Sequence, residues 1–106
     1  FYSSKVTEKE TIETIKYIHK INKKIVDPHT AVGIKTARNY LEEYEDSAVI
    51  ALETAHPIKF SSAVFKALGK KPKIPEKFKK IFEGKEKYEI FENNFKSIRD
   101  FIISNA

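Results

Sequence analysis

Residues 47–60 read SAVIALETAHPIKF, and this stretch decides how the whole chain is interpreted. It begins with a short run that is apolar almost throughout and does not alternate with polar residues. Such a run is typical of a strand that is buried on both faces, as in a parallel sheet. We therefore predict one buried strand over about residues 47–53. The fold class is then α/β, although helical patterns fill most of the chain.

The residues after the predicted strand stand where α/β proteins bind their ligands. Thr54 follows the apolar run directly, and Pro57 suits the first turn of a new helix. In open α/β sheets, ligands bind at the carboxyl ends of strands, close to the N-termini of the helices that follow. A hydroxyl group at Thr54 would there hydrogen-bond a buried ligand atom. The alternative is that Thr54 or His56 only caps the helix that Pro57 begins.

Two capped helices are predicted on the amino-terminal side of this stretch. Thr7 and Glu10 have the spacing of a capping box at the start of a helix over Glu8 to Asn22. Asp27 suits the N-cap of a second helix, because Pro28 at its first position loses only an amide without a helical partner. The apolar stripe of the first helix consists of Ile12, Ile15, Ile18 and Ile21.

The start of the second helix is also a candidate site. Its sequence is VDPHTAVG, residues 26–33, in which His29 and Thr30 occupy the first turn. First-turn amides together with these two side chains would hold an anion; the alternative is a capped helix start without a ligand. Gly33 lies inside the helix and costs up to about 1 kcal/mol relative to alanine. We expect it to allow the close approach of another backbone or of a ligand.

Shorter helices are predicted on the carboxyl-terminal side. The helix that begins at Pro57 ends at Gly69, and a short helix runs between Pro75 and Gly84. Asn94 suits the N-cap of a last helix. The side chains expected to face inward from this last helix are Phe95, Ile98, Phe101 and Ile102.

Composition excludes several classes of site. The chain has 106 residues and no cysteine, which excludes disulfides and thiolate metal sites and favours a cytoplasmic location. Three histidines lie far apart in the sequence, so no metal site is expected. No apolar run reaches the length of roughly 18–20 residues that a membrane span requires.

The net charge of +5 leaves two interpretations open. The lysines are scattered or alternate with glutamates, which favours a solvated surface without a nucleic-acid partner. The alternative is a small basic helical module that binds nucleic acid or a partner protein.

A single strand buried on two faces needs neighbours that satisfy its backbone groups. The rest of the sequence offers no second strand pattern, and the chain contains no methionine. Both observations predict a fragment whose sheet neighbours lie in the upstream part of the same polypeptide. An intermolecular sheet is the other possibility.

Two motifs in this order resemble a known family. The stretches VDPHTAVGIKTARNYL (residues 26–41) and VIALETAHPIKF (residues 49–60) are followed by KIPEKFKKIFEGKEKYEIF (residues 73–91). Together they are similar to the carboxyl-terminal part of the threonine synthase family, in its longer bacterial and fungal branch. The resemblance covers residues 1–106, so we interpret the whole chain as one carboxyl-terminal segment.

The resemblance implies a fold and a reaction. Members of this family are pyridoxal-phosphate enzymes with a tryptophan-synthase-like fold of type II, built on a parallel sheet. They convert O-phospho-L-homoserine, a small-molecule substrate, and water to L-threonine and phosphate. The family's Schiff-base lysine and phosphate-binding loop lie upstream, so no catalytic residue is expected in this segment, and the segment alone is expected to be inactive. A related dehydratase would keep the fold and change the reaction, but the Asp-Pro-His-Thr motif argues against it.

The resemblance also implies which residues touch the cofactor. Thr54 matches the hydroxyl residue that faces the pyridine nitrogen, and Ala55 and His56 would line the same wall. Asp27, His29 and Thr30 match a family motif without a definite chemical role, and we expect them to shape the active-site side of the second helix.

Overall fold

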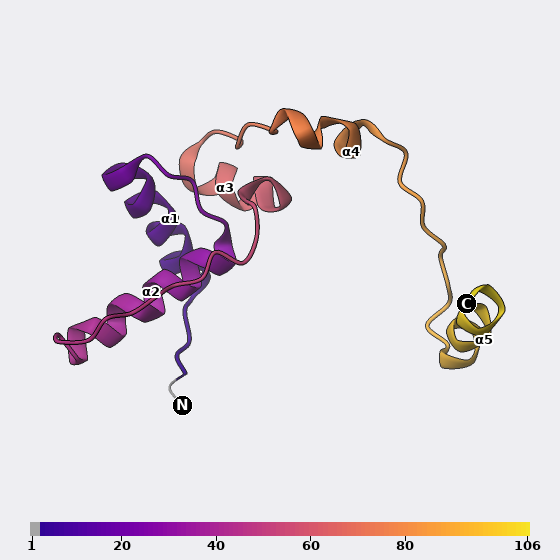
Figure 1. The fold of residues 1–106 in the computed structure, drawn as a ribbon, viewed down its shortest axis with the longest axis horizontal. Helices are drawn as coiled ribbons and strands as arrows, with labels where there is room; N and C mark the ends of the chain where they lie inside the picture. The colour runs from indigo at the N-terminus through magenta and orange to yellow at the C-terminus, as the bar shows by residue number, and fades with distance from the viewer. Residues whose placement is uncertain (1–2) are drawn as a thin grey trace. The chain divides into compact units, whose positions relative to one another are not determined.

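The chain divides into two units, which are described separately. The computed structural model describes residues 3–106. One unit ends at Pro75, and the other spans Glu76–Ala106 (Figure 1).

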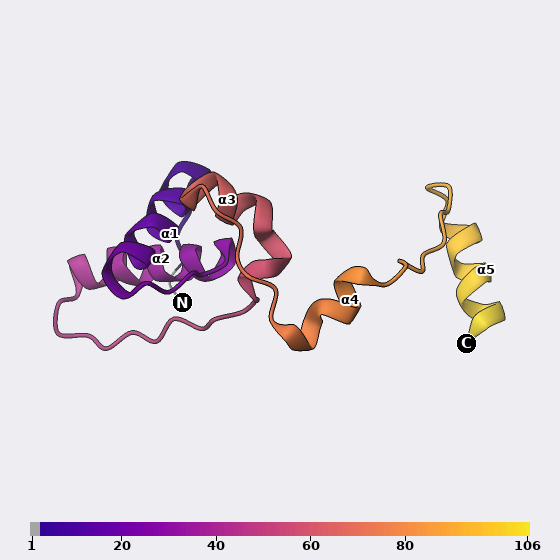
Figure 2. The ribbon, with the colours of Figure 1, turned by 90° about the horizontal axis from the view of Figure 1, so that it is seen from above.

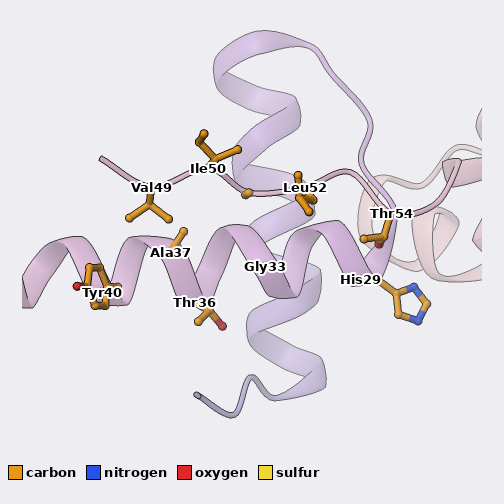
Figure 3. A pocket seen from close by; sticks show the side chains of 10 residues that line it. His29, Gly33, Thr36, Ala37, Tyr40, Val49, Ile50, Leu52 and Thr54 are labelled. Atoms are coloured by element: carbon orange, nitrogen blue, oxygen red, sulfur yellow. The ribbon is translucent and has the colours of Figure 1, made fainter. Parts of the chain in front are cut away.

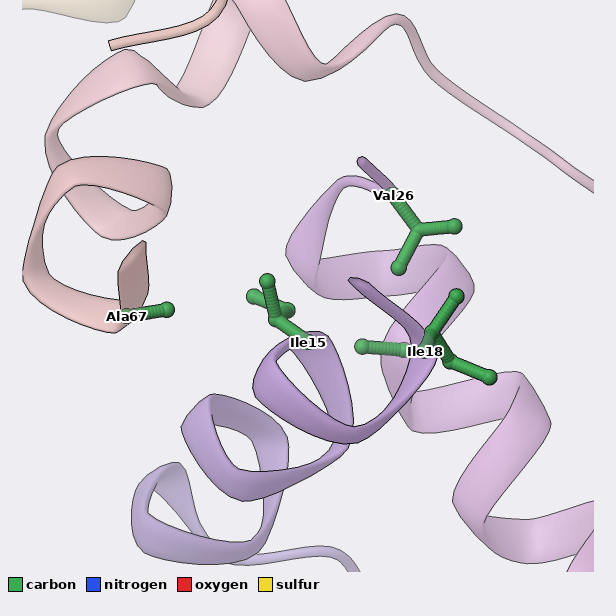
Figure 4. Close-up of a cluster of buried hydrophobic side chains, with 5 residues drawn as sticks. Ile15, Ile18, Val26 and Ala67 are labelled. Carbon is green, nitrogen blue, oxygen red and sulfur yellow. The ribbon is translucent and has the colours of Figure 1, made fainter. Parts of the chain in front are cut away.

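The first unit contains the core. It is built from helices α1 (Glu8–Asn22), α2 (Pro28–Glu43) and α3 (Ser61–Leu68), and the short 3₁₀ helix η1 (Pro57–Phe60) leads into α3. Helix α1 packs against both α2 and α3 (Figures 1 and 2). The buried cluster between these elements consists of Ile15, Ile18, Val26, Ala31 and Ala67 (Figure 4).

The capping box predicted at the start of α1 is confirmed. The Thr7 hydroxyl accepts a hydrogen bond from the Glu10 amide at 3.3 Å, and the Glu10 carboxylate accepts one from the Thr7 amide at 2.8 Å. Two otherwise unpaired amides are thereby satisfied. The helix ends at Asn22, and the C-cap residue Lys23 has a left-handed backbone (φ 61°) and donates its amide to the carbonyl of His19.

The buried face of α1 is rotated relative to the predicted stripe. Ile15 and Ile18 are buried, but Ile21 is 56% exposed. Thr11 and Thr14 are buried instead, and their hydroxyls donate to backbone carbonyls one turn earlier. A threonine can enter this face because its hydroxyl finds a partner within the helix itself.

The predicted buried strand over about residues 47–53 is wrong. Residues 47–54 have no regular secondary structure, and residues 3–106 contain no strand. On one face of the segment Ile50 is 87% exposed and Leu52 is 73% exposed, and on the other face Val49 is 39% exposed, so neither face is buried. The physical reason is that a strand needs a neighbour to pair with, and the part of the chain that the structure describes supplies none. The segment instead runs alongside α2 (Figure 3).

The predicted end of the third helix is confirmed at Gly69. This glycine has φ 67°, and its amide donates to the carbonyl of Phe65 at 2.8 Å. The left-handed conformation is one that a residue without a Cβ adopts at little cost.

The second unit holds the 3₁₀ helix η2 (Glu76–Phe78), helix α4 (Lys79–Glu83) and helix α5 (Phe95–Asn105). The predicted cap of the last helix is confirmed, because the side chain of Asn94 accepts hydrogen bonds from the amides of Lys96 and Ser97. The side chains expected to face inward remain exposed in this unit, which has no buried residue in its helices. No helix among residues 3–106 is long and apolar enough to cross a membrane.

Candidate functional site

A cleft lies between α2 and the segment that follows it, and we call it the α2 cleft. Its volume is about 540 Å³. Figure 3 shows the irregular segment running along the helix, with Val49 near one end of the cleft and Thr54 near the other. The lining residues are His29, Gly33, Thr36, Ala37 and Tyr40 of α2 and Val49, Ile50, Ala51, Leu52 and Thr54 of the segment.

The helical wall of the cleft follows from the spacing of α2. Residues 29, 33, 36 and 40 recur every three or four positions, and residue 37 lies four positions after residue 33, so all five share one face of the helix. Tyr40 and Thr36 were not among the predicted site residues, but this spacing was the signal in the sequence that could have found them. At Gly33, an added Cβ would meet no atom within 4 Å, so no backbone approaches it in the described residues.

Thr54 lies at the same end of the cleft as His29 (Figure 3). Thr54 is exposed, and among residues 3–106 its hydroxyl has no hydrogen-bond partner. The adjacent Glu53 accepts a hydrogen bond from Lys24 Nζ at 2.7 Å. This ion pair joins the segment, one residue before Thr54, to the connection before α2.

Ala55 and His56 do not line the cleft. His56 is instead the N-cap of η1, where its Nδ1 accepts a hydrogen bond from the Ile58 amide at 3.3 Å. Pro57 follows at the first position and is buried. The interpretation of His56 as a helix cap is thereby confirmed. Its effect on the site is to fix the turn that directly follows Thr54.

Asp27 is fully buried and caps α2, as predicted. Its carboxylate accepts hydrogen bonds from the amides of His29 (2.9 Å) and Thr30 (3.4 Å) and from the buried Thr30 hydroxyl. Burial raises the pKa of Asp27, but these hydrogen bonds and the His29 ring outweigh it and hold the pKa below its ordinary value. The first-turn amides that were candidates for an external anion are therefore occupied by a carboxylate of the chain itself.

The His29 ring is held from two sides. Its Nδ1 lies 3.1 Å from Asp27 Oδ1, and the ring of Phe60 meets it edge-on with centroids 4.7 Å apart. The side chain of His29 is nevertheless 62% exposed. The structure thus brings His29 and Thr54 to one cleft, with Asp27 and Thr30 buried beneath His29.

The residues of the cleft suit one part of a pyridoxal-type cofactor. Apolar walls that end in an unpartnered hydroxyl fit a flat aromatic ring with one polar ring atom. Among residues 3–106, no lysine lines the cleft, so this part of the chain offers no amine for an imine linkage there. Among residues 3–106, no group of three histidine, aspartate or glutamate side chains could hold a metal ion.

Sequence comparisons place these motifs among known enzymes. Residues 30–102 match the family model described as threonine synthase, C-terminal. The chain is 32% identical over 103 residues to threonine synthase of Corynebacterium glutamicum, covering 97% of this chain and 21% of that protein. It is 39% identical over 105 residues to threonine synthase of Saccharomyces cerevisiae, covering 87% of this chain and 20% of that protein.

A solved structure is similar to this chain. The crystal structure of pyridoxal-phosphate-bound threonine synthase from Brucella melitensis is similar with a TM-score of 0.73 and 31% sequence identity. The match covers 96% of this chain and 22% of that chain. The chain therefore spans about a fifth of the length of these relatives.

Proposed function

The chain belongs to the threonine synthase family, whose carboxyl-terminal model it matches over residues 30–102, and we propose that it forms the carboxyl-terminal part of such an enzyme. The whole enzyme would convert O-phospho-L-homoserine and water to L-threonine and phosphate. The observation that carries this proposal is the meeting of both sequence motifs at one end of the α2 cleft, through His29 and Thr54. Because the chain spans about a fifth of its relatives, the remaining residues of the site come from the rest of the polypeptide.

The proposed cofactor is pyridoxal phosphate, bound by the whole enzyme. When bound, it supplies the electron sink for chemistry at the amino-acid substrate. Thr54 is the residue of this chain that faces the pyridine nitrogen, and its hydroxyl has no competing partner among residues 3–106. A neutral hydroxyl does not hold that nitrogen protonated as a carboxylate would, so it sets a weaker electron sink. His56 acts by capping η1, which fixes the turn that follows Thr54.

The proposed setting is a cytoplasmic enzyme with an α/β domain of the type II fold. The parallel sheet of that domain belongs to the upstream part of the polypeptide, which also covers the α2 cleft. The exposed apolar side chains beside the cleft, Ile50 and Leu52, support such a covering element, because their exposure to water is unfavourable. The nucleic-acid-binding alternative is set aside because the family match extends over most of the chain.

The test uses the full-length polypeptide that carries this chain, assayed for phosphate release from O-phosphohomoserine. Thr54→Val removes the hydroxyl at nearly constant volume, and we expect activity to fall by about tenfold, the effect of losing one hydrogen bond in a buried site. Thr54→Ser keeps the hydroxyl and should retain most of the activity. Cofactor absorbance should shift in the valine variant only.

Two outcomes would count against the proposal. A wild-type polypeptide that binds pyridoxal phosphate but releases no phosphate would assign a different reaction, such as that of a related dehydratase. Equal activity and equal absorbance of the valine and serine variants would remove Thr54 from the cofactor.

A further inference from the structure

The contact between Asp27 and His29 goes beyond what a helix cap requires. Two amide hydrogen bonds, at 2.9 and 3.4 Å, already complete the cap of α2. The Thr30 hydroxyl also donates to this carboxylate, and the His29 ring adds a fourth partner at 3.1 Å. Phe60 contacts the same ring edge-on. A mostly exposed ring is thereby fixed against a fully buried carboxylate.

This arrangement determines which ring nitrogen carries hydrogen. The hydrogen bonds that lower the pKa of Asp27 keep its carboxylate ionised at neutral pH, and an ionised carboxylate only accepts. Nδ1 of His29 is therefore the donor to Asp27. In the neutral ring, Nε2 then carries the lone pair. A carboxylate that orients a histidine in this way is a recurring device of proton transfer in enzymes.

Nε2 of His29 is available to accept a proton, and the proposed reaction releases one. His29 lines the α2 cleft at the end where Thr54 lies (Figure 3). It also lines a second cleft of about 450 Å³, to which α1, α2 and α3 all contribute residues. The proposed reaction consumes one water molecule, which must give up a proton when its oxygen bonds to the substrate. Among the residues that line the α2 cleft, His29 is the only histidine, and histidine is the side chain that most often serves as a general base.

We propose that His29 is a catalytic residue of the threonine synthase reaction and that Asp27 is its positioning residue. Phosphate leaves the γ-carbon of the substrate, whereas the hydroxyl group of threonine stands on the β-carbon, so water adds to a carbon–carbon double bond after phosphate has departed. As the water oxygen bonds to the β-carbon, the electron pair of that double bond moves to the neighbouring carbon, one O–H bond of the water breaks, and the proton moves to Nε2 of His29. The ring then gives this proton to the released phosphate or to solvent. The inference rests on the proposed function and adds the base that handles the water.

The test compares variants of the full-length enzyme in steady-state kinetics. His29→Asn keeps a polar atom near the Nδ1 position and removes Nε2, whereas His29→Gln places an amide near Nε2 that cannot take a proton. In both, kcat should fall by about 100-fold or more, the usual contribution of a general base, with KM changed less than about threefold. Added imidazole should restore part of kcat in His29→Ala. Asp27→Asn preserves the cap and should still lower kcat by at least about tenfold.

The controls separate the inference from the proposed function. His19→Gln alters a histidine of α1 outside the α2 cleft and should leave kcat unchanged. If the wild type releases phosphate and both His29 variants keep kcat within about threefold, the inference is overturned and the proposed function stands. A lost activity that accompanies a lower thermal midpoint and is not rescued by imidazole would assign the pair to stability alone, which also overturns the inference. A wild type without phosphate release overturns the proposed function.

Discussion

Residues 27–30 and residues 47–54 carry the two sequence motifs of this chain, but their surroundings differ. In the first stretch, Asp27 and Thr30 are buried, and every hydrogen bond of the Asp27 carboxylate is made within three residues. In the second stretch, Ile50 and Leu52 are exposed, and the backbone has no sheet partner in residues 3–106. The first stretch needs only its own neighbours, whereas the second needs atoms that lie far away in sequence.

The largest effect is expected in the core beneath the first stretch. Ile15→Ala should lower the free energy of unfolding by about 2–5 kcal/mol, because Ile15 is fully buried between α1, α2 and α3. Ile21→Ala on the same helix is the matched control, and its half-exposed side chain should cost far less. Urea denaturation of the chain followed by circular dichroism measures both. Equal costs would show that the core is not where the structure places it.

The second-largest loss of stability is expected from removing the N-cap of α2. Asp27→Ala should destabilise the first unit by about 0.5–2 kcal/mol, since it removes the acceptor for two helix amides and the Thr30 hydroxyl. Asp27→Asn keeps an acceptor of good capping type and should cost less. Thermal unfolding of the two variants side by side gives the ranking, and an asparagine variant as unstable as the alanine variant would contradict it.

Acid should weaken the same cap. Because the pKa of Asp27 is lower in the folded state, its contribution to stability is present above the ordinary aspartate pKa of about 3.9 and is lost as pH falls through the folded value. Glu8 and Glu10 also have lowered pKa values and act in the same direction. Stability measured between about pH 3 and pH 7 should therefore vary less in Asp27→Asn than in the wild type. Identical pH profiles would exclude Asp27 as a contributor.

Two glycines provide a smaller test of the cleft wall. Gly33→Ala should stabilise the chain by up to about 1 kcal/mol, because the added methyl group meets open space in α2. Gly69→Ala should instead destabilise it, since φ is 67° at that position. Thermal midpoints measure both signs. In the full-length enzyme, a Gly33→Ala variant that is stable but loses cofactor would show that another part of the polypeptide or the cofactor approaches this position.

The smallest effect is expected in the second stretch. Ile50→Ser should change the stability of the chain by less than about 0.5 kcal/mol, because Ile50 is 87% exposed. A loss of several kcal/mol in the same denaturation experiment would mean that the segment is covered in solution. The same substitution in the full-length polypeptide should cost more, if the upstream part covers the cleft as proposed.

Local patterns account for the parts of the fold that the sequence predicts correctly. The caps at Thr7, Asp27 and Asn94 and the helix end at Gly69 all depend on hydrogen bonds between residues a few positions apart. The predicted strand over residues 47–53 was wrong because a strand depends on partners that are distant in sequence. An apolar run indicates that a segment is buried, but a strand forms only when its backbone hydrogen-bonds to an adjacent strand.

In the candidate site, too, local features were predictable from the sequence and long-range contacts were not. Thr54 and His29 could be selected from their motifs, and the structure brings them to one cleft. The contribution of Phe60 could not be predicted, because its contact with His29 joins η1 to α2 across about thirty intervening residues. The Asp27–His29 contact was within reach, since the two residues lie two positions apart at a helix start.

The segment beside α2 is anchored at its two ends. A turn, in which the Ser47 amide donates to the Tyr44 carbonyl, holds one end, and the Lys24–Glu53 ion pair holds the other. The apolar side chains between these anchors take no part in the core cluster. A covering polypeptide can therefore pack onto the middle of the segment without disrupting the packing of α1, α2 and α3. In the whole enzyme, the upstream part would then pack onto helices and a segment that are already in place.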